Sequence, residues 1–227
     1  HMKKKIVILG STGSIGKSLI NILKKDKKNF EIIILTANEN IKELLKQVKI
    51  FKVKNIIITN NKKFNDIKKI LKNKNINIYN NFDSIPKILN KEKIDYTMNA
   101  VSGLDGLKPT LNIIKFTKQI AIANKESIIC GWSLINNKLK RYKTQFIPID
   151  SEHFSIWSLI NEAKDYNIEK VFITASGGPF NNYQLNKFNL ITPKLALKHP
   201  NWKMGKKITI DSATMMNKVF EIIEAKK

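Results

Sequence analysis

Three carboxylates in the second half of the chain have the residue types and spacing of a metal site. Asp150 and Glu152 follow a predicted strand, residues 145–149, and on an extended backbone two such residues point to the same side. Glu221 lies further along, on a predicted helix. Carboxylate oxygens are the ligands that Mg²⁺ and Mn²⁺ prefer. Two acids at a strand end are often only solvated loop residues, but the third acid favours a metal site.

The sequence just before Glu221 also has residues suited to holding a phosphate. Asp211 or Ser212 is expected to cap a helix. Asn217, Lys218 and Glu221 then share one face of that helix. Free amides at a helix N-terminus, together with a side-chain amide and a cation, bind phosphate well. The alternative is an ordinary surface ion pair between Lys218 and Glu221, three residues apart.

A glycine-rich turn directly after the first predicted strand indicates a nucleotide site. It reads Gly10-Ser11-Thr12-Gly13-Ser14-Ile15-Gly16 and leads into a helix rich in Leu and Ile. Glycines permit a tight turn, a close approach of backbone amides to a pyrophosphate, and close packing of helix on strand. Such a turn is weak evidence alone, but its position at the first strand-to-helix junction favours a dinucleotide.

The end of the second predicted strand, residues 30–36, indicates which dinucleotide is bound. NAD enzymes usually hold the ribose hydroxyls with an acid at the tip of this strand, and no acid stands there in this chain. Its absence favours NADP. Glu39 follows closely enough to oppose that interpretation, and the nearest cations, Lys42 and Lys46, are equally well explained as exposed helix lysines.

Two further segments have features of active-site lids. The first is the loop 176–179, Ser-Gly-Gly-Pro, after a predicted strand at residues 170–175. The second is the segment 199–205, which carries His199 and Trp202. Loops with an aromatic residue and a histidine are frequently lids. A lone histidine is also commonly a surface residue, and a tryptophan a packing anchor, so the residues alone leave both explanations open.

Short Ile/Val-rich runs alternate with helical stretches through the first 149 residues, which is the rhythm of a parallel sheet covered on both faces. The predicted strands are residues 4–9, 30–36, 55–59, 95–101, 119–123 and 144–149. Lys-rich amphipathic segments at 41–51 and 64–71 supply crossovers. We expect an α/β, Rossmann-like domain over residues 3–149 and part of an α+β catalytic domain over residues 150–227.

Composition limits the classes of function. No apolar run approaches the roughly 20 residues that span a bilayer, and the single cysteine, Cys130, excludes an intramolecular disulfide. The net charge of +23 suggests a nucleic-acid partner. However, the lysines are scattered, with no basic stripe interleaved with aromatic residues, which favours a solvated basic surface. A basic nucleic-acid-binding protein is therefore the alternative from another class.

Six motifs, in this order, resemble one family, 1-deoxy-D-xylulose 5-phosphate reductoisomerase. They are GSTGSIG (10–16), ANKES (123–127), PIDSEH (148–153), ASGGPF (175–180), HPNWKMG (199–205) and DSATMMNK (211–218). The resemblance covers essentially the whole chain. It implies an enzyme of isoprenoid precursor synthesis that rearranges 1-deoxy-D-xylulose 5-phosphate and reduces the branched aldehyde with NADPH to 2-C-methyl-D-erythritol 4-phosphate. Another NADP-dependent oxidoreductase on the same fold is the nearer alternative.

The resemblance also implies roles for individual residues. A divalent metal, Mn²⁺ or Mg²⁺, would be held by Asp150, Glu152 and Glu221 and would act as Lewis acid and template. The catalytic residues would be Lys125, Glu152 and His199. The sugar phosphate would be bound by Asn124, Lys125, Ser151, Ser176, His199, Trp202, Ser212, Asn217 and Lys218. NADPH would be bound by Gly10, Thr12, Gly13, Ser14, Ile15, Ala37, Asn38, Asn40, Ala100, Asn124, Glu126, Met204 and Gly205.

A flap over about residues 177–206 is expected to close on the substrate and exclude water. Two departures from the family pattern matter. The family often has a small and then a basic residue at the positions of Asn38 and Glu39, so contact with the 2′-phosphate is in question here. The metal-bearing helix reads Val219-Phe220 where the family has Gly-Leu, which changes local packing and leaves Glu221 in register.

The family resemblance also sets expectations for the assembly. Members are longer, with a helical C-terminal domain, so this chain is expected to bind NADPH but to be catalytically incomplete by itself. At full length a homodimer is expected, with no nucleic-acid or membrane partner. The implied location is the bacterial cytoplasm, or the plastid stroma after removal of a transit peptide.

Overall fold

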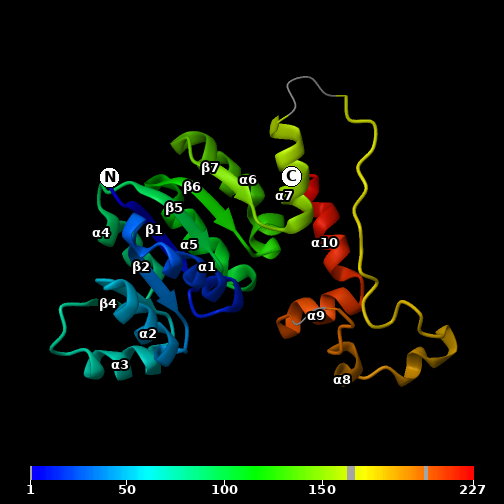
Figure 1. Cartoon of the computed structure of the whole chain (residues 1–227), viewed down its shortest axis with the longest axis horizontal. Coiled ribbons are helices and arrows are strands. Elements are labelled where there is room, and N and C mark those ends of the chain that lie inside the picture. Colours follow the sequence, from blue (N-terminus) through cyan, green and yellow to red (C-terminus); the bar gives the residue numbers. More distant parts are fainter. Residues whose placement is uncertain (1, 163–166, 202–203) are drawn as a thin grey trace. The chain divides into compact units, whose positions relative to one another are not determined.

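The computed structural model describes residues 2–162, 167–201 and 204–227. The chain divides into two compact units, His1–Ile149 and Asp150–Lys227. Each unit is described by itself below, and both are drawn in Figure 1.

The first unit is built on a seven-stranded parallel sheet with the strand order β4-β3-β2-β1-β5-β6-β7. The strands are β1 (Lys4–Leu9), β2 (Phe30–Ala37), β3 (Asn55–Ile58), β4 (Asn77–Tyr79), β5 (Ile94–Asn99), β6 (Thr117–Ile122) and β7 (Gln145–Pro148). Six of the seven follow the predicted runs, so the α/β, Rossmann-like fold is confirmed. The unpredicted strand, β4, has three residues at the sheet edge, too few to show a period.

Helices cover both faces of this sheet. They are α1 (Ser14–Lys25), α2 (Ile41–Phe51), α3 (Asn61–Ile70), α4 (Ile85–Leu89), α5 (Leu107–Ile113) and α6 (Lys125–Tyr142). Alternate residues of each strand face opposite sides, so two hydrophobic cores form. One core packs α1, α2 and α3 against residues such as Ile6 and Ile8 of β1. The other packs α4, α5 and α6 against Val7 and Leu9.

The strand order reverses beside β1, because β2 pairs with one of its edges and β5 with the other. Ligands of open parallel sheets bind at such a reversal, outside the carboxyl ends of the strands. The glycine-rich turn begins at Gly10, directly after β1 ends at Leu9. Sheet topology therefore places that turn at the position where a dinucleotide is bound.

The described part of the second unit consists of helices and loops. Its α-helices are α7 (Ser151–Glu162), α8 (Pro193–Ala196), α9 (Lys206–Ala213) and α10 (Met216–Ala225), with a 3₁₀ helix at Leu185–Leu190. In Figure 1, α7 lies beside α10, and the contacts between them bring together segments about 60 residues apart in sequence. No helix in the described ranges is long and apolar enough to cross a membrane.

The strand predicted at residues 170–175 is wrong, because these residues form no strand. A strand needs the backbone of a neighbour for its hydrogen bonds, and none of the described residues of this unit is in a strand. The apolar side chains that suggested a strand remain unburied in this unit: Val171 is 52% exposed and Phe172 is 84% exposed.

Candidate active site

Asp150, Glu152 and Glu221 come together within the second unit. Each offers a carboxylate oxygen, and these three oxygens lie within 4.8 Å of one another. Glu221 is only 1% exposed, and burying a carboxylate is costly unless a cation or hydrogen bonds compensate it. A converging set of hard oxygen donors, one of them buried, is chemically suited to a divalent cation such as Mg²⁺ or Mn²⁺.

The local geometry differs from the extended backbone expected for Asp150 and Glu152. Helix α7 begins at Ser151, so Glu152 lies in its first turn. The carbonyl of Asp150 accepts the Phe154 N–H at 2.8 Å, which places Asp150 at the start of that helix. Acidic side chains are favourable at a helix N-terminus because of the exposed amides there. The two acids therefore converge through a helix start rather than through a strand.

Lys218 is the cation that the cluster already contains. Its Nζ lies 3.2 Å from Glu152 Oε1 and also donates to Glu221 Oε2. Burial lowers the pKa of Lys218, but the hydrogen bonds to Glu221 and Glu152 outweigh it and raise that pKa. Burial likewise raises the pKa of Glu152, yet hydrogen bonds from the Ser151 hydroxyl, from the backbone N–H of Glu152 itself and from Lys218 lower it to about 2. Both groups are therefore charged near neutral pH.

The alternative, an ion pair between Lys218 and Glu221 on the surface, is right about the pair but wrong about the surface. The pair exists, but the side chains are 14% and 1% exposed. Asn217 Nδ2 also donates to Glu221 Oε1, at 2.5 Å, so the predicted shared face of Asn217, Lys218 and Glu221 is confirmed. The residues hold one buried carboxylate from two sides.

The expectation that Asp211 or Ser212 caps this helix is also wrong. Both lie in the last turn of the preceding helix α9. Helix α10 begins at Met216, after Met215 in the left-handed region with φ 62°. Asp211 instead lies within α9, where its ion pair with Lys207, one turn earlier and at 2.6 Å, stabilises that helix.

His153 and Glu224 are residues of this cluster to which sequence reasoning gave no role. His153 is 7% exposed, and its Nε2 lies 2.8 Å from the backbone carbonyl of Glu221. Its Nδ1 lies 3.5 Å from Glu224 Oε2 and 3.9 Å from Asp150 Oδ2. The available signal was spacing, because His153 follows Asp150 by three residues and Glu224 follows Glu221 by three.

The predicted phosphate and flap residues are partly brought together. Ser176 Oγ and His199 Nε2 form a hydrogen bond of 3.1 Å. The backbone at Gly178 lies against Ser212, since a Cβ added at this glycine would sit 2.9 Å from the Ser212 carbonyl oxygen. Met204 is exposed just before α9, and Gly205 is the N-cap of that helix. Trp202 lies outside the described residues.

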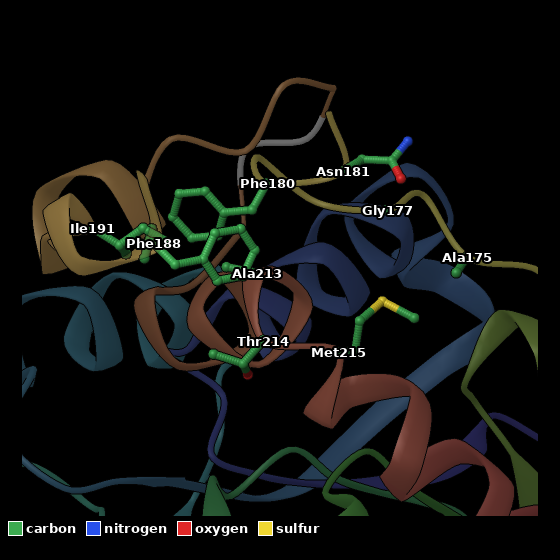
Figure 2. A pocket seen from close by; sticks show the side chains of 10 residues that line it. Ala175, Gly177, Phe180, Asn181, Phe188, Ile191, Ala213, Thr214 and Met215 are labelled. Atoms are coloured by element: carbon green, nitrogen blue, oxygen red, sulfur yellow. The ribbon is translucent and has the colours of Figure 1, made fainter. Parts of the chain in front are cut away.

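An apolar pocket of about 670 Å³ lies between the loop after residue 174 and the end of α9. In Figure 2 the side chains of Phe180 and Phe188 lie close to Ala213, while that of Asn181 points away from them. Tyr183 joins the two phenylalanines, with ring centroids 5.5 and 6.1 Å from theirs. The three rings hold the end of the ASGGPF loop against the residues that follow it, and Ala213 of α9 lines the same pocket.

The nucleotide turn in the first unit requires its glycines. Gly10 has φ +77°, and a Cβ there would lie 2.7 Å from the Ala100 carbonyl oxygen. A Cβ at Gly16 would lie 2.4 Å from the Gly10 carbonyl oxygen. Gly13 is the N-cap of the twelve-residue helix α1, and Ser14 and Ile15 begin it on the exposed side. Exposed amides at a helix N-terminus next to a tight turn fit a pyrophosphate.

Polar side chains at the end of β2 are held by residues after β3. Asn38 Oδ1 accepts from Thr59 Oγ1 at 3.1 Å, and Glu39 Oε1 accepts from Asn60 Nδ2 at 3.2 Å. Asn40 caps α2 by accepting the Glu43 N–H at 3.1 Å. Ala37, which ends the strand, is buried.

Asn124, Lys125 and Glu126 lie at the carboxyl end of β6, on the same edge of the sheet as the glycine turn. Asn124 is the N-cap of α6, and its Oδ1 accepts the Ser127 N–H at 3.2 Å. Its Nδ2 is buried with no hydrogen-bond partner among the described residues. Lys125 and Glu126 begin the helix and are half-buried.

A parallel sheet with this turn at its reversal point defines an α/β dinucleotide-binding protein, and the three acids add a candidate metal site in the second unit. The family model described as 1-deoxy-D-xylulose 5-phosphate reductoisomerase matches residues 6–131, and that of the C-terminal domain of the same enzyme matches residues 146–227. The chain belongs to the 1-deoxy-D-xylulose 5-phosphate reductoisomerase family, as its motifs predicted.

Curated relatives and solved structures agree with this assignment. The 1-deoxy-D-xylulose 5-phosphate reductoisomerase of Pelagibacter ubique is 67% identical over 99% of this chain, and that of Phocaeicola vulgatus is 42% identical over 99%. The chain spans 58% of the length of both relatives. The structure of the Zymomonas mobilis enzyme in complex with NADPH has a TM-score of 0.87 and 36% identity, covering 99% of this chain and 57% of that one.

A second solved structure, DOX-P reductoisomerase in complex with NADPH, fosmidomycin and magnesium, has a TM-score of 0.85 and 32% identity. The similarity covers 98% of this chain and 57% of that one.

Proposed function

We propose that the protein containing this chain converts 1-deoxy-D-xylulose 5-phosphate to 2-C-methyl-D-erythritol 4-phosphate, using NADPH and a divalent metal. The observation that carries the proposal is the set of three carboxylate oxygens within 4.8 Å of one another in a chain of this family. A simple dehydrogenase on the same sheet has no use for such a set. This argues against another NADP-dependent oxidoreductase.

The proposed NADPH site is the edge of the sheet in the first unit. The amides at Thr12, Ser14 and Ile15 would face the pyrophosphate, because this turn begins a helix at the reversal point, while the Gly13 N–H closes the turn onto the Gly10 carbonyl. Ala37, Asn38, Asn40, Ala100 and Glu126 lie at the same edge and would surround the rest of the cofactor. Met204 and Gly205 are proposed as further cofactor-binding residues. The complex of the Zymomonas mobilis relative with NADPH supports this assignment.

Asp150, Glu152 and Glu221 would hold the metal, for which the magnesium complex of a relative gives support. The bound cation would supply Lewis acidity toward the substrate's carbonyl and hydroxyl oxygens. Lys218 would remain beside the metal and bind phosphate, since two carboxylates keep it protonated. Ser151 Oγ, which donates to Glu152 Oε2 at 2.7 Å, would orient that carboxylate and reach a substrate hydroxyl.

The phosphate would be held by Ser176, Ser212, Asn217 and Lys218, and His199 would close over it from the flap. The hydrogen bond between Ser176 and His199 links flap closure to phosphate binding. The packed aromatic residues behind the ASGGPF loop would keep water out once the flap closes. Asn124 and Lys125 are proposed as further substrate-binding residues, with Lys125 as a catalytic cation.

We further propose a homodimer as the full-length assembly, with a small sugar phosphate and no nucleic acid or membrane as its partner. The relatives named above are bacterial, which favours the cytoplasm over a plastid as the location.

The decisive experiment measures NADPH oxidation by the full-length protein with and without 1-deoxy-D-xylulose 5-phosphate and Mn²⁺ or Mg²⁺. We expect oxidation only when substrate and metal are both present. Oxidation that persists in a chelator, or that another carbonyl substrate supports equally well, would contradict the proposal. Glu169→Gln serves as control, because this exposed acid pairs with its neighbour Lys170, lies in the same unit and is not a candidate ligand.

A further inference from the structure

The glycine-rich turn is fastened by a buried amide from another helix. Gln47 belongs to α2 and is 1% exposed. Its Nε2 donates to the backbone carbonyl of Ser11 at 2.9 Å. Ser11, in the turn after β1, is itself fully buried. The bond therefore ties the turn to a residue 36 positions later in the sequence.

The polar groups of Gly10 and Ser11 are otherwise held by Thr36, on β2. Gly10 N–H donates to Thr36 Oγ1 at 2.7 Å. Both the N–H and the Oγ of Ser11 donate to the Thr36 carbonyl, at 2.9 and 3.2 Å. Thr36 reaches neither carbonyl: that of Gly10 accepts the Gly13 N–H at 3.3 Å, and that of Ser11 accepts from Gln47.

A glutamine at this position of α2 is less favourable for stability than an apolar residue. Its neighbours on the buried face, Leu44 and Val48, belong to the hydrophobic core. The Gln47 Oε1 is buried with no hydrogen-bond partner in the described ranges, and an unsatisfied buried polar atom destabilises a fold. A methionine or leucine would avoid that cost. What the glutamine adds is the donor for Ser11, with a weaker bond to Glu43 Oε1 at 3.2 Å.

The bond to Ser11 also sets the direction of the next amide. The Ser11 carbonyl and the Thr12 N–H belong to one planar peptide and point in opposite directions when it is trans, and the chain has no cis peptide. Because the carbonyl points at Gln47, the Thr12 N–H points away from α2. This is the first of the three amides, those of Thr12, Ser14 and Ile15, assigned above to the pyrophosphate.

We propose that Gln47 is a positioning residue for NADPH, acting by fixing the Ser11–Thr12 peptide without touching the cofactor. The inference rests on the proposed NADPH binding. Without the bond from Gln47, the peptide can rotate to bring its carbonyl toward water, and its amide then no longer faces the pyrophosphate. Affinity for ligands that contain a pyrophosphate falls, while affinity for the adenosine portion alone does not.

The test is Gln47→Met in the full-length protein, because methionine keeps the length and volume of the side chain and removes the donor. The dissociation constants of NADPH and of adenosine 2′-phosphate, which has no pyrophosphate, are measured by calorimetry, together with the melting temperature. We expect the NADPH constant to rise about tenfold and the adenosine 2′-phosphate constant to change less than about twofold. Gln119→Met is the matched control, since this exposed glutamine bonds Gln145 across β6 and β7.

The possible results separate cleanly. A folded Gln47→Met variant with unchanged NADPH affinity overturns the proposal, and so does an equal weakening of both ligands, which would mark a purely structural role. If the variant does not fold, Gln47→Asn answers the same question, because its amide is one methylene too short to reach Ser11. Failure of the unaltered protein to bind NADPH would overturn the proposed function itself, which the first titration reveals.

Discussion

The Nε2–H of His153 donates to the backbone carbonyl of Glu221 across 2.8 Å, joining the first turn of α7 to α10. Since a carbonyl can only accept, the hydrogen must be on Nε2. The other ring nitrogen faces Glu224 and Asp150 at 3.5 and 3.9 Å. One buried side chain therefore lies behind the three candidate metal ligands and sets the distance between the helices that carry them.

From this arrangement we predict that His153→Phe weakens Mn²⁺ binding by about tenfold to a hundredfold, the usual cost of losing a residue that orients ligands. Phenylalanine keeps the ring volume and removes the donor to Glu221. Mn²⁺ titration of the full-length protein, followed by electron paramagnetic resonance, measures the effect. NADPH affinity is expected to stay unchanged. Normal Mn²⁺ affinity in a folded variant would show that His153 only fills space.

Glu152→Gln is predicted to remove most metal-dependent turnover while sparing NADPH affinity. The change deletes a charged ligand and leaves Lys218 paired with Glu221, while the glycine turn belongs to the other unit. Turnover at limiting Mn²⁺ and the dissociation constant of NADPH are the two measurements. Near-normal rates at limiting Mn²⁺ would mean that Glu152 is not a ligand, and the three-carboxylate site would fail. Glu169→Gln again controls for the loss of an acid.

The sheet could be predicted from sequence because its signals are local. Each long strand, such as β2, is a run of apolar residues bounded by turn residues, and a buried parallel strand needs nothing else. The strand predicted at residues 170–175 carried the same signal and is wrong, because pairing depends on a partner that a local pattern cannot supply.

The candidate site was predicted in its acids but not in its geometry. Asp150, Glu152 and Glu221 stand out by residue type, whereas the start of α7 at Ser151 and the left-handed Met215 depend on tertiary packing. Gln47 had no visible signal of its own, and His153 had only its spacing from Asp150, because the groups that they bind lie 36 and 68 residues away. The role of a buried polar side chain depends on its hydrogen-bond partner, and a partner this distant in sequence cannot be identified from a local pattern.

Cofactor choice gives a third prediction: the protein binds NADPH more tightly than NADH, and Glu39→Lys widens the difference by about fivefold or more. No acid stands at the tip of β2, and Asn60 holds the carboxylate of Glu39 at 3.2 Å. A lysine at this position would add attraction for the 2′-phosphate, roughly 1 kcal/mol for a partly exposed pair. Titrations of both cofactors provide the comparison. The control is Glu31→Lys, which makes the same charge change at the exposed start of β2.

Equal or tighter binding of NADH by the unaltered protein would contradict this prediction. It would show that Glu39 selects the unphosphorylated ribose in spite of its bond to Asn60.

The last prediction concerns acid stability and Asp95, which links three strands of the sheet. Its Oδ2 accepts the Lys5 N–H from β1 at 2.8 Å, and its Oδ1 accepts from Lys118 Nζ of β6 at 2.7 Å. The hydrogen bond from Lys118, followed by that from the Lys5 backbone, holds the pKa of Asp95 below its ordinary value of 3.8. A carboxyl with a lowered folded pKa adds stability above its unfolded pKa and loses that contribution as pH falls through the folded value.

Asp95→Asn should therefore lower the melting temperature near neutral pH by roughly 2–4 °C, the effect of losing about 1 kcal/mol in a domain of this size. The deficit should shrink below about pH 3, where wild-type Asp95 also becomes neutral. Melting curves of both proteins at about pH 7 and about pH 3 give the comparison. Asp66→Asn is the control, because its exposed pair with Lys63 spans 3.7 Å and contributes little. A deficit as large at low pH as at neutral pH would place the contribution of Asp95 in packing rather than in its charge.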